Sequence, residues 1–286
     1  MLSLLRFLPL LSASALFLMS CGSSERTTPK PSAPPVVDEP YVIEEGGELN
    51  PVASPEATKG GTFTNWGGPY PKSLNMWLNY NNFSKSICEL MFESLVGMHP
   101  TENRPIGILA EEWEVSDDQM TFTFTIRDQA RWSDGTPITA RDFQFYYDTI
   151  MNPENLTSLF RVSLRRFDRP EIVDDKTIRI QANEPHWMNF WTAAGLTAFP
   201  AHMWEEKDFN EINFEFDVVS GPYRLYEVNT NRFIMLQRRG DWWGRYLKIN
   251  QNTHNLDYLR FLNEAAFNDL GTFNTLLTAL DLTGLS

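Results

Sequence analysis

Residues 111–151 read EEWEVSDDQMTFTFTIRDQARWSDGTPITARDFQFYYDTIM and predict a β-hairpin followed by a helix. Within residues 121–127, threonines alternate with phenylalanine and isoleucine, which is typical of a half-buried strand. An Asp-Gly pair at 134–135 indicates a turn. Thr139 stands three residues before Asp142, a spacing that favours a capped helix start, and aromatic residues at helical spacing follow. The stretch therefore predicts strands, a turn and a helix in a fixed order.

The same stretch resembles a known protein family. Its pattern W-E-V-S-D-D, then R-D, then W-S-D-G-x-P-I-T-A-x-D, resembles the hallmark block of extracellular solute-binding proteins of family 5. Residues 220–244, SGPYRLYEVNTNRFIMLQRRGDWWG, resemble a second block of that family, and the order of the two blocks also agrees. Residues 245–261 are most similar to the oligopeptide and microcin-uptake branch. The resemblance covers roughly residues 60–281 and implies a receptor component of an ABC importer.

The resemblance implies an α/β fold of the periplasmic-binding-protein type II class, with mixed sheets and flanking helices. We expect residues 60–268 to form the first lobe. Residues 269–286 resemble the start of the second lobe, which is then largely missing. On this interpretation the chain is truncated: a fragment, a premature stop or a split gene product. Family receptors work by closing two lobes around a ligand, a motion that one lobe alone cannot perform.

The first residues predict export and a lipid anchor. Residues 1–20 contain one basic residue, Arg6, followed by an uncharged apolar run, as in a signal peptide. The sequence Leu-Met-Ser-Cys ending at Cys21 resembles a bacterial lipobox, so we expect a lipid on Cys21 and an extracytoplasmic, membrane-anchored protein. A plain signal peptide is the alternative. Residues 21–59 are rich in proline and polar residues, and we expect a disordered tether there.

The composition excludes several classes of protein. With 286 residues, 42% of them hydrophobic, the chain is long enough for a large core. The formal net charge of −13 argues against nucleic acid as a partner, because a nucleic-acid backbone is bound by a basic surface. The two cysteines are too few for a disulfide framework. We interpret Cys88, on a probable helix, as a small buried residue.

Sequence motifs for catalysis or metal binding are absent. The chain contains neither the phosphate-binding pattern G-x-x-x-x-G-K-[ST] nor the nucleophile elbow G-x-S-x-G. Its four histidines are scattered without the spacing of a zinc site. We therefore expect a binding protein with no catalytic residues, no metal and no cofactor.

The candidate ligand site begins at the loop Tyr80-Asn81-Asn82, just before a predicted helix over residues 83–95. In oligopeptide-binding relatives the corresponding loop contacts the peptide. Tyr80 offers an aromatic face and a hydroxyl, and the asparagine amides can satisfy a peptide backbone. The alternative is a helix-capping loop with asparagine at the cap.

Two tryptophans complete the predicted ligand-binding set. Trp66 ends the first predicted strand, and Trp191 lies in a short aromatic helix predicted over residues 186–194. A wall of aromatic side chains suits a receptor of broad specificity. Core packing is the alternative for this helix. Another hairpin is predicted over residues 171–180.

These observations together predict the binding component of an ABC importer. The resemblance implies oligopeptides as ligand, with a permease and ATPase subunits as partners. Other ligands of the same family remain open: a dipeptide, a nickel chelate or an oligosaccharide. A surface lipoprotein that binds nothing after truncation is the alternative from a different class.

Overall fold

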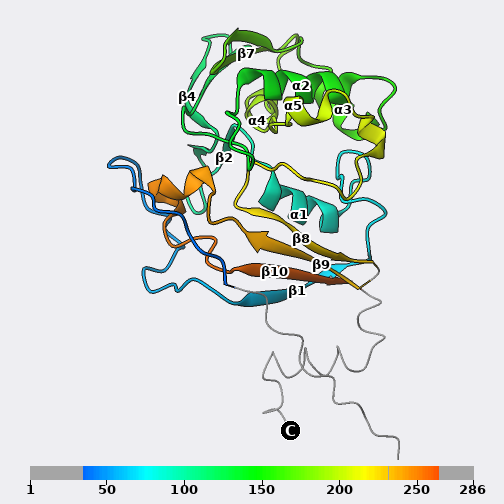
Figure 1. Ribbon diagram of the computed structural model, residues 1–286. Helices are drawn as coiled ribbons and strands as arrows, with labels where there is room; N and C mark the ends of the chain where they lie inside the picture. Colours follow the sequence, from blue (N-terminus) through cyan, green and yellow to red (C-terminus); the bar gives the residue numbers. More distant parts are fainter. Residues whose placement is uncertain (1–34, 231, 264–286) are drawn as a thin grey trace, which may run out of the picture. The chain divides into compact units, whose positions relative to one another are not determined.

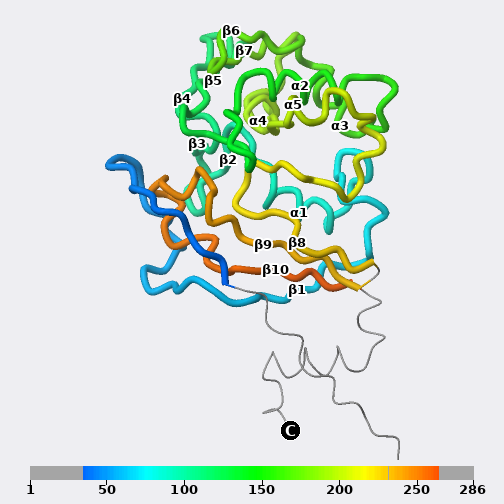
Figure 2. The backbone as a smooth tube through the Cα atoms, viewed as in Figure 1, coloured from blue at the N-terminus to red at the C-terminus, as the bar shows by residue number. Residues whose placement is uncertain are grey.

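The computed structural model describes residues 35–230 and 232–263. Its first sheet has four strands (Figure 1). In spatial order these are β1 (Thr62–Gly68), β10 (Tyr258–Asn263), β9 (Phe233–Arg238) and β8 (Tyr223–Asn229). β1 is parallel to β10, and the other pairs are antiparallel. The first sheet therefore joins an early strand to the last three strands of the described chain (Figure 2).

The second sheet is antiparallel and also has four strands. In spatial order these are β4 (Ala110–Val115), β5 (Thr121–Ile126), β7 (Thr177–Gln181) and β6 (Glu171–Asp174). The apolar side chains of β5 are buried, so the strand predicted over residues 121–127 is confirmed. The hairpin predicted over residues 171–180 is confirmed as β6–β7. A short ribbon is formed by β2 (Val96–Met98) and β3 (Pro105–Gly107).

The helices form two groups (Figure 1). α1 (Asn82–Met91) packs against the first sheet, and α2 (Ala140–Met151) packs against β6 and β7 of the second. α3 (Ser158–Leu164) and α5 (Ala201–Trp204) contact α2, and α4 (Asn189–Ala194) packs against the second sheet through Phe190. Short 3₁₀ helices are present at η1 (Phe209–Glu211), η2 (Trp243–Tyr246) and η3 (Lys248–Asn250). The fold is thus a mixed α/β arrangement.

The predicted cap of α2 is confirmed. The Asp142 carboxylate accepts hydrogen bonds from the backbone N–H of Thr139 at 2.9 Å and of Ala201 at 3.2 Å. Burial raises the pKa of Asp142, although these hydrogen bonds favour the ionised form. A single carboxylate therefore satisfies unpaired N–H groups at the starts of both α2 and α5.

Two helices begin or end elsewhere than predicted. The helix expected over residues 83–95 ends at Met91, because the backbone N–H of Glu93 donates to Ser220 Oγ and that of Leu95 to the Leu196 carbonyl. The helix expected over residues 186–194 begins only at Asn189. In the first case tertiary partners replace the next helical hydrogen bonds.

The core is aromatic. The ring of Trp77 lies edge-on to Phe199, with 4.6 Å between centroids, and Tyr146 lies edge-on to the same ring at 4.8 Å. Trp132 is 1% exposed, in agreement with a packing role. Cys88 is also buried; its thiol donates to the Leu74 carbonyl, and burial raises its pKa to about 12. Cys88 is therefore the small buried residue that the sequence predicted.

A buried polar cluster attaches the 220–244 block to the end of α1. Arg239 donates to the carbonyl oxygens of Val219, Ser220 and Gly221. Trp243 Nε1 donates to the Glu93 carboxylate at 2.9 Å. Burial raises the pKa of Glu93 to about 8, although Trp243 and Arg239 act in the opposite direction.

Gly221 allows this close approach. A Cβ atom at position 221 would lie 2.6 Å from the Leu90 carbonyl oxygen, a distance that real side chains essentially never show. The motif Ser-Gly-Pro-Tyr therefore contains its glycine because two backbones touch there.

Tertiary hydrogen bonds begin before the predicted boundary at Gly60. Residues 35–59 were expected to continue a disordered tether, but they pack along the later part of the chain. Asp38 pairs with Lys59 at 2.6 Å and with the buried guanidinium of Arg238, and the Glu44 carboxylate accepts the Lys248 N–H at 2.9 Å. The tether prediction is therefore wrong for these residues, since acidic side chains of this segment pair with Lys59 within it and with Arg238 and the Lys248 N–H outside it.

Several predictions fall outside the described residues. These are the signal peptide, the lipid on Cys21 and the second-lobe start at 269–286. In the part of the chain that the structure describes, no helix has the length and apolar character needed to cross a membrane.

Candidate functional site

The loop before α1 is held in place by asparagines. Asn81 is the N-cap of α1: its side-chain oxygen accepts the Ser84 N–H at 2.8 Å, and its side-chain nitrogen donates to the Asn79 carbonyl at 3.0 Å. Both ends of the Asn81 amide are thus used within the fold. Tyr80 and Asn82, in contrast, expose their side chains, and Tyr80 is 49% exposed. Of the three predicted loop residues, these two are available to a ligand.

Tyr80 belongs to an apolar surface that includes α3. Its ring lies edge-on to Phe160, with 6.0 Å between centroids. Leu156, Leu159 and Val162 are 70%, 60% and 56% exposed. We call these five residues the α3 patch. Leu159 and Val162 lie three residues apart on α3 and share a face of that helix, and exposed apolar surface of this kind can form an interaction site.

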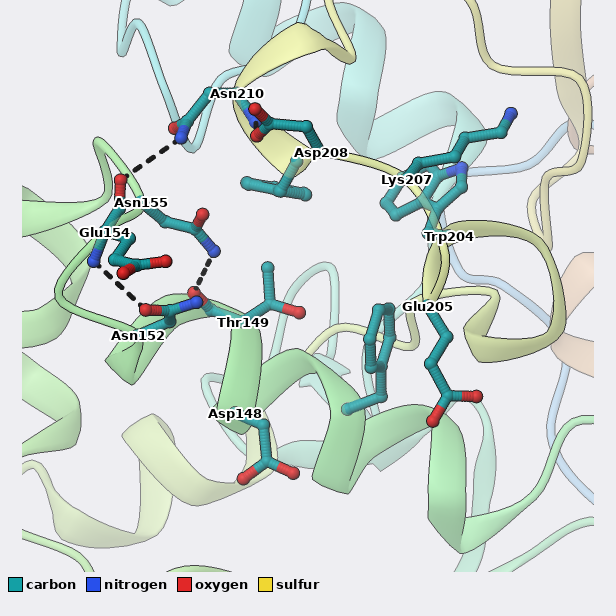
Figure 3. Close-up of a pocket in the computed structure, with 12 residues that line it drawn as sticks. Asp148, Thr149, Asn152, Glu154, Asn155, Trp204, Glu205, Lys207, Asp208 and Asn210 are labelled. Atoms are coloured by element: carbon teal, nitrogen blue, oxygen red, sulfur yellow. Dashed lines mark hydrogen bonds between the residues drawn. The ribbon is translucent and has the colours of Figure 1, made fainter.

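A cavity of about 580 Å³ adjoins the chain segment that leads into this patch (Figure 3). We call it the α2 cavity. It is lined by the end of α2, the turn after it, and the segment from α5 through η1. Its lining residues are Phe145, Asp148, Thr149, Asn152, Glu154, Asn155, Trp204, Glu205, Lys207, Asp208, Phe209 and Asn210. Cavities of this size commonly hold small ligands or single side chains.

Hydrogen bonds fix the walls of the α2 cavity. Asn155 Nδ2 donates to the Thr149 carbonyl at 2.8 Å. Asn210 Nδ2 donates to the Glu154 carbonyl at 3.1 Å, and Asn210 Oδ1 accepts the Leu156 N–H at 2.9 Å. Because Leu156 is part of the α3 patch, the same segment borders both the cavity and the patch.

The two predicted tryptophans lie elsewhere. Trp66 pairs with Leu262 across β1–β10, whereas the adjacent Phe261 packs against Phe83 of α1. Since neighbours on a strand point to opposite faces, Trp66 lies on the sheet face away from α1. Trp191 lies in α4 beside Phe190, whose ring contacts the second sheet. The structure therefore groups Tyr80, Asn81 and Asn82, and it separates Trp66 and Trp191 from them.

The sequence analysis missed the α3 patch and the α2 cavity. A signal for the patch existed, because apolar residues at 156, 159, 160 and 162 follow Pro153 without the polar spacing of a surface helix. The cavity had no such signal. Its two walls, residues 145–155 and 204–210, are brought together only by tertiary contacts.

The site offers no metal chemistry among the residues that are described. No group of three or more His, Cys, Asp or Glu in that part of the chain has the geometry to hold a metal ion. The polar groups of the site are amides, hydroxyls and carboxylates, together with the ammonium of Lys207. This inventory suits recognition of a ligand.

The model of bacterial extracellular solute-binding proteins, family 5 (middle region), matches residues 104–264. The chain belongs to this family. The blocks at 111–151 and 220–244 both lie within the match, so the family predicted from them is confirmed. Family 5 members are binding proteins, which agrees with the expectation of a binding protein.

Family 5 relatives include peptide-binding proteins. The chain is 25% identical to the dipeptide-binding protein DppE of Bacillus subtilis over 61% of its length and 35% of the relative. It is 25% identical to the probable peptide-binding protein YejA of Agrobacterium fabrum over 90% of its length and 42% of the relative. The chain thus spans less than half the length of these relatives.

A solved structure confirms the fold class of this family 5 chain. The oligopeptide-binding protein OppA of Haemophilus influenzae, in complex with the peptide RPPGFSPFR, superposes with a TM-score of 0.62 at 20% sequence identity. The match covers 77% of this chain and 45% of that one. The predicted periplasmic-binding-protein type II fold, present in part, is therefore confirmed.

Proposed function

We propose that this chain forms the first lobe of an extracytoplasmic receptor that captures oligopeptides for an ABC importer. Membership of family 5 and relatives named as peptide-binding proteins support the proposal. Capture needs no covalent step. A bound peptide would use amides such as that of Asn82 for its backbone, directly or through water, and the α3 patch for its apolar side chains.

The proposal includes a cellular location and partner proteins. The signal peptide at residues 1–20 would direct export, a lipid on Cys21 would hold the protein at a membrane, and a permease with ATPase subunits would receive the ligand. Residues 269–286 would lead into a second lobe that closes over the peptide.

The half-exposed ring of Tyr80, which lies edge-on to the partly buried Phe160, is the observation that carries the peptide proposal. Tyrosine is enriched among the residues that dominate binding interfaces, because its ring supplies apolar contact area and its hydroxyl a polar contact. Here the Tyr80 ring is half exposed beside three exposed aliphatic side chains. Such a surface fits a ligand with alternating apolar side chains and backbone amides.

The test is an NMR titration of the full chain with the pentapeptide Ala-Leu-Phe-Leu-Ala, since this method detects even millimolar binding. We expect shift changes at Tyr80, Asn82 and α3, and about tenfold weaker binding for Tyr80→Ala, the size of effect typical of a central aromatic contact. Trp187→Ala, which removes an 82% exposed aromatic residue near α4, is the matched control and should bind normally. Peptide binding that Tyr80→Ala leaves unchanged would refute the role of this surface.

A further inference from the structure

A separate hollow of about 530 Å³ lies against the second sheet, and we call it the α4 hollow. One wall comes from the stretch 115–122, at the turn between β4 and β5, and the other from the stretch 185–190, where the chain enters α4. The α4 hollow shares no residue with the α2 cavity or the α3 patch. It is therefore a second candidate site.

An exposed tryptophan borders the α4 hollow. Trp187 is 82% exposed. The His186 ring lies nearly parallel to it, with 6.0 Å between the centroids and 24° between the planes. Phe190 adds another aromatic ring to the lining. Because ligand sites combine aromatic side chains with a few well-placed polar groups, these rings supply the apolar part of such a site.

A second and independent feature is the side chain of Asn189, which also lines the α4 hollow and is only 2% exposed. Its side-chain nitrogen donates to the Glu184 carbonyl at 2.8 Å. Its side-chain oxygen is buried without a hydrogen-bond partner among the residues that the structure describes. Buried amide oxygens normally accept a hydrogen bond, because leaving them unpaired is unfavourable. The hollow is the space from which a ligand could supply the missing donor.

The charges of the α4 hollow narrow the class of ligand. Asp118 Oδ1 accepts hydrogen bonds from Ser116 Oγ at 2.5 Å and from the Met120 N–H at 3.0 Å, which fixes the carboxylate and leaves its second oxygen open to a ligand. The Ser116 hydroxyl holds the pKa of Asp118 below its usual value. The described lining contains no lysine or arginine, the side chains that bind phosphates and carboxylates. An anionic ligand is therefore disfavoured, and a ligand with several hydrogen-bond donors is favoured.

We propose that the α4 hollow binds the ring of a neutral sugar. A pyranose has an apolar C–H face that can pack on the exposed ring of Trp187, and its hydroxyl groups can donate to the Asn189 oxygen and the Asp118 carboxylate. A quaternary ammonium ion would also be attracted to the Trp187 ring and to Asp118, but it has no donor for Asn189. This sugar site is additional to the peptide surface at Tyr80 and does not depend on it.

The test is an NMR titration of the full chain with cellobiose and with N,N′-diacetylchitobiose, two neutral disaccharides that differ in their acetamido groups. At least one of them should shift the indole N–H signal of Trp187 and the backbone signals of residues 185–190 in a saturable way. Trp187→Ala should weaken this binding about tenfold, whereas Trp187→Phe, which keeps a ring, should lose less. Asn189→Ala should also weaken it. Phe63→Ala, which removes a 52% exposed ring outside the hollow, is the matched control and should bind normally.

Three results would overturn the sugar site: neither disaccharide binds at millimolar concentration, Trp187→Ala leaves the affinity unchanged, or Asn189→Ala does so. Because Trp187 is largely exposed, its replacement leaves the core intact, so loss of binding in that variant reports on the contact. Tetramethylammonium is the competing probe. Its binding at Trp187 without binding of either disaccharide would show a cation site and refute the sugar assignment. Since the hollow shares no residue with the Tyr80 surface, failure of peptide binding would not affect this test.

Discussion

Replacing Glu93 with glutamine should change how the stability of this protein depends on pH. Glu93 is 7% exposed, and burial raises its pKa from 4.5 to about 8, against the opposing effects of Trp243 and Arg239. The folded state therefore binds the Glu93 proton more tightly than the unfolded state does. The resulting stabilisation is fully present below pH 4.5 and is lost as the pH rises through 8.

The structure sets the size of this effect. Each pKa unit corresponds to about 1.36 kcal/mol. The rise from 4.5 to about 8 therefore corresponds to at most roughly 4–5 kcal/mol of stability lost between acidic and alkaline pH. Glutamine has nearly the same shape, and its carbonyl oxygen can still accept the hydrogen bond from Trp243 Nε1. The stability advantage of Glu93→Gln over the wild type should thus grow by at most roughly 4 kcal/mol between pH 5 and pH 8.5.

The assay is urea unfolding followed by tryptophan fluorescence, at several pH values from 5 to 9. Only the difference between variant and wild type is used, because it cancels the titration of other groups such as Asp142 and His254. Glu89→Gln is the control, since Glu89 is an exposed glutamate on α1 that pairs only loosely with Lys85 at 3.5 Å. Parallel stability curves for wild type and Glu93→Gln would refute the reasoning. They would mean that Glu93 stays ionised in the fold, held so by Arg239.

Three further substitutions test the supports of the site, each by urea unfolding. Asn75→Ala should cost roughly 2–3 kcal/mol, because the buried Asn75 side chain bonds the Ile212 carbonyl at 2.9 Å and the Trp77 N–H at 3.2 Å; a loss below 0.5 kcal/mol would contradict this. Asn81→Ala should cost about 1 kcal/mol as a lost helix cap, whereas Asn81→Asp should restore most of it. Gly221→Ala should cost roughly 2 kcal/mol or more, since its Cβ would meet the Leu90 carbonyl; an unchanged midpoint would show that the backbones can separate.

Local patterns predicted the elements that depend on neighbouring residues. The alternation in β5 and the Thr139–Asp142 spacing at α2 were enough, because strand burial and helix capping are decided within a few residues. The end of α1 was not predictable in this way. It is set by Ser220, which lies far along the chain and takes the Glu93 N–H. Helix propensity is a local property of the sequence, so it does not reflect a hydrogen bond that forms only in the tertiary fold.

The candidate site likewise combines features that local sequence predicts with features that only the tertiary fold decides. Tyr80 and its loop were predicted from the family resemblance, because the loop stands at a corresponding position, just before a helix, in oligopeptide-binding relatives. Trp66 was expected at the ligand because it is aromatic, but which face of β1 it occupies depends on pairing with Leu262 of β10. The α2 cavity depends on two segments that no local pattern connects. Residue type indicates which contacts a side chain can make, but it does not show which residues share one surface.

The segment at residues 208–213 supports both parts of the candidate site. On one side, Asn210 bonds the turn after α2 and the Leu156 N–H of the α3 patch. On the other, the Ile212 carbonyl accepts the Asn75 side chain, which anchors the chain leading to Tyr80. A ligand that spans the α2 cavity and the Tyr80 ring would therefore contact surfaces supported by one short segment. Because hydrogen bonds already fix this segment on both sides, they reduce the ordering that recognition would otherwise require.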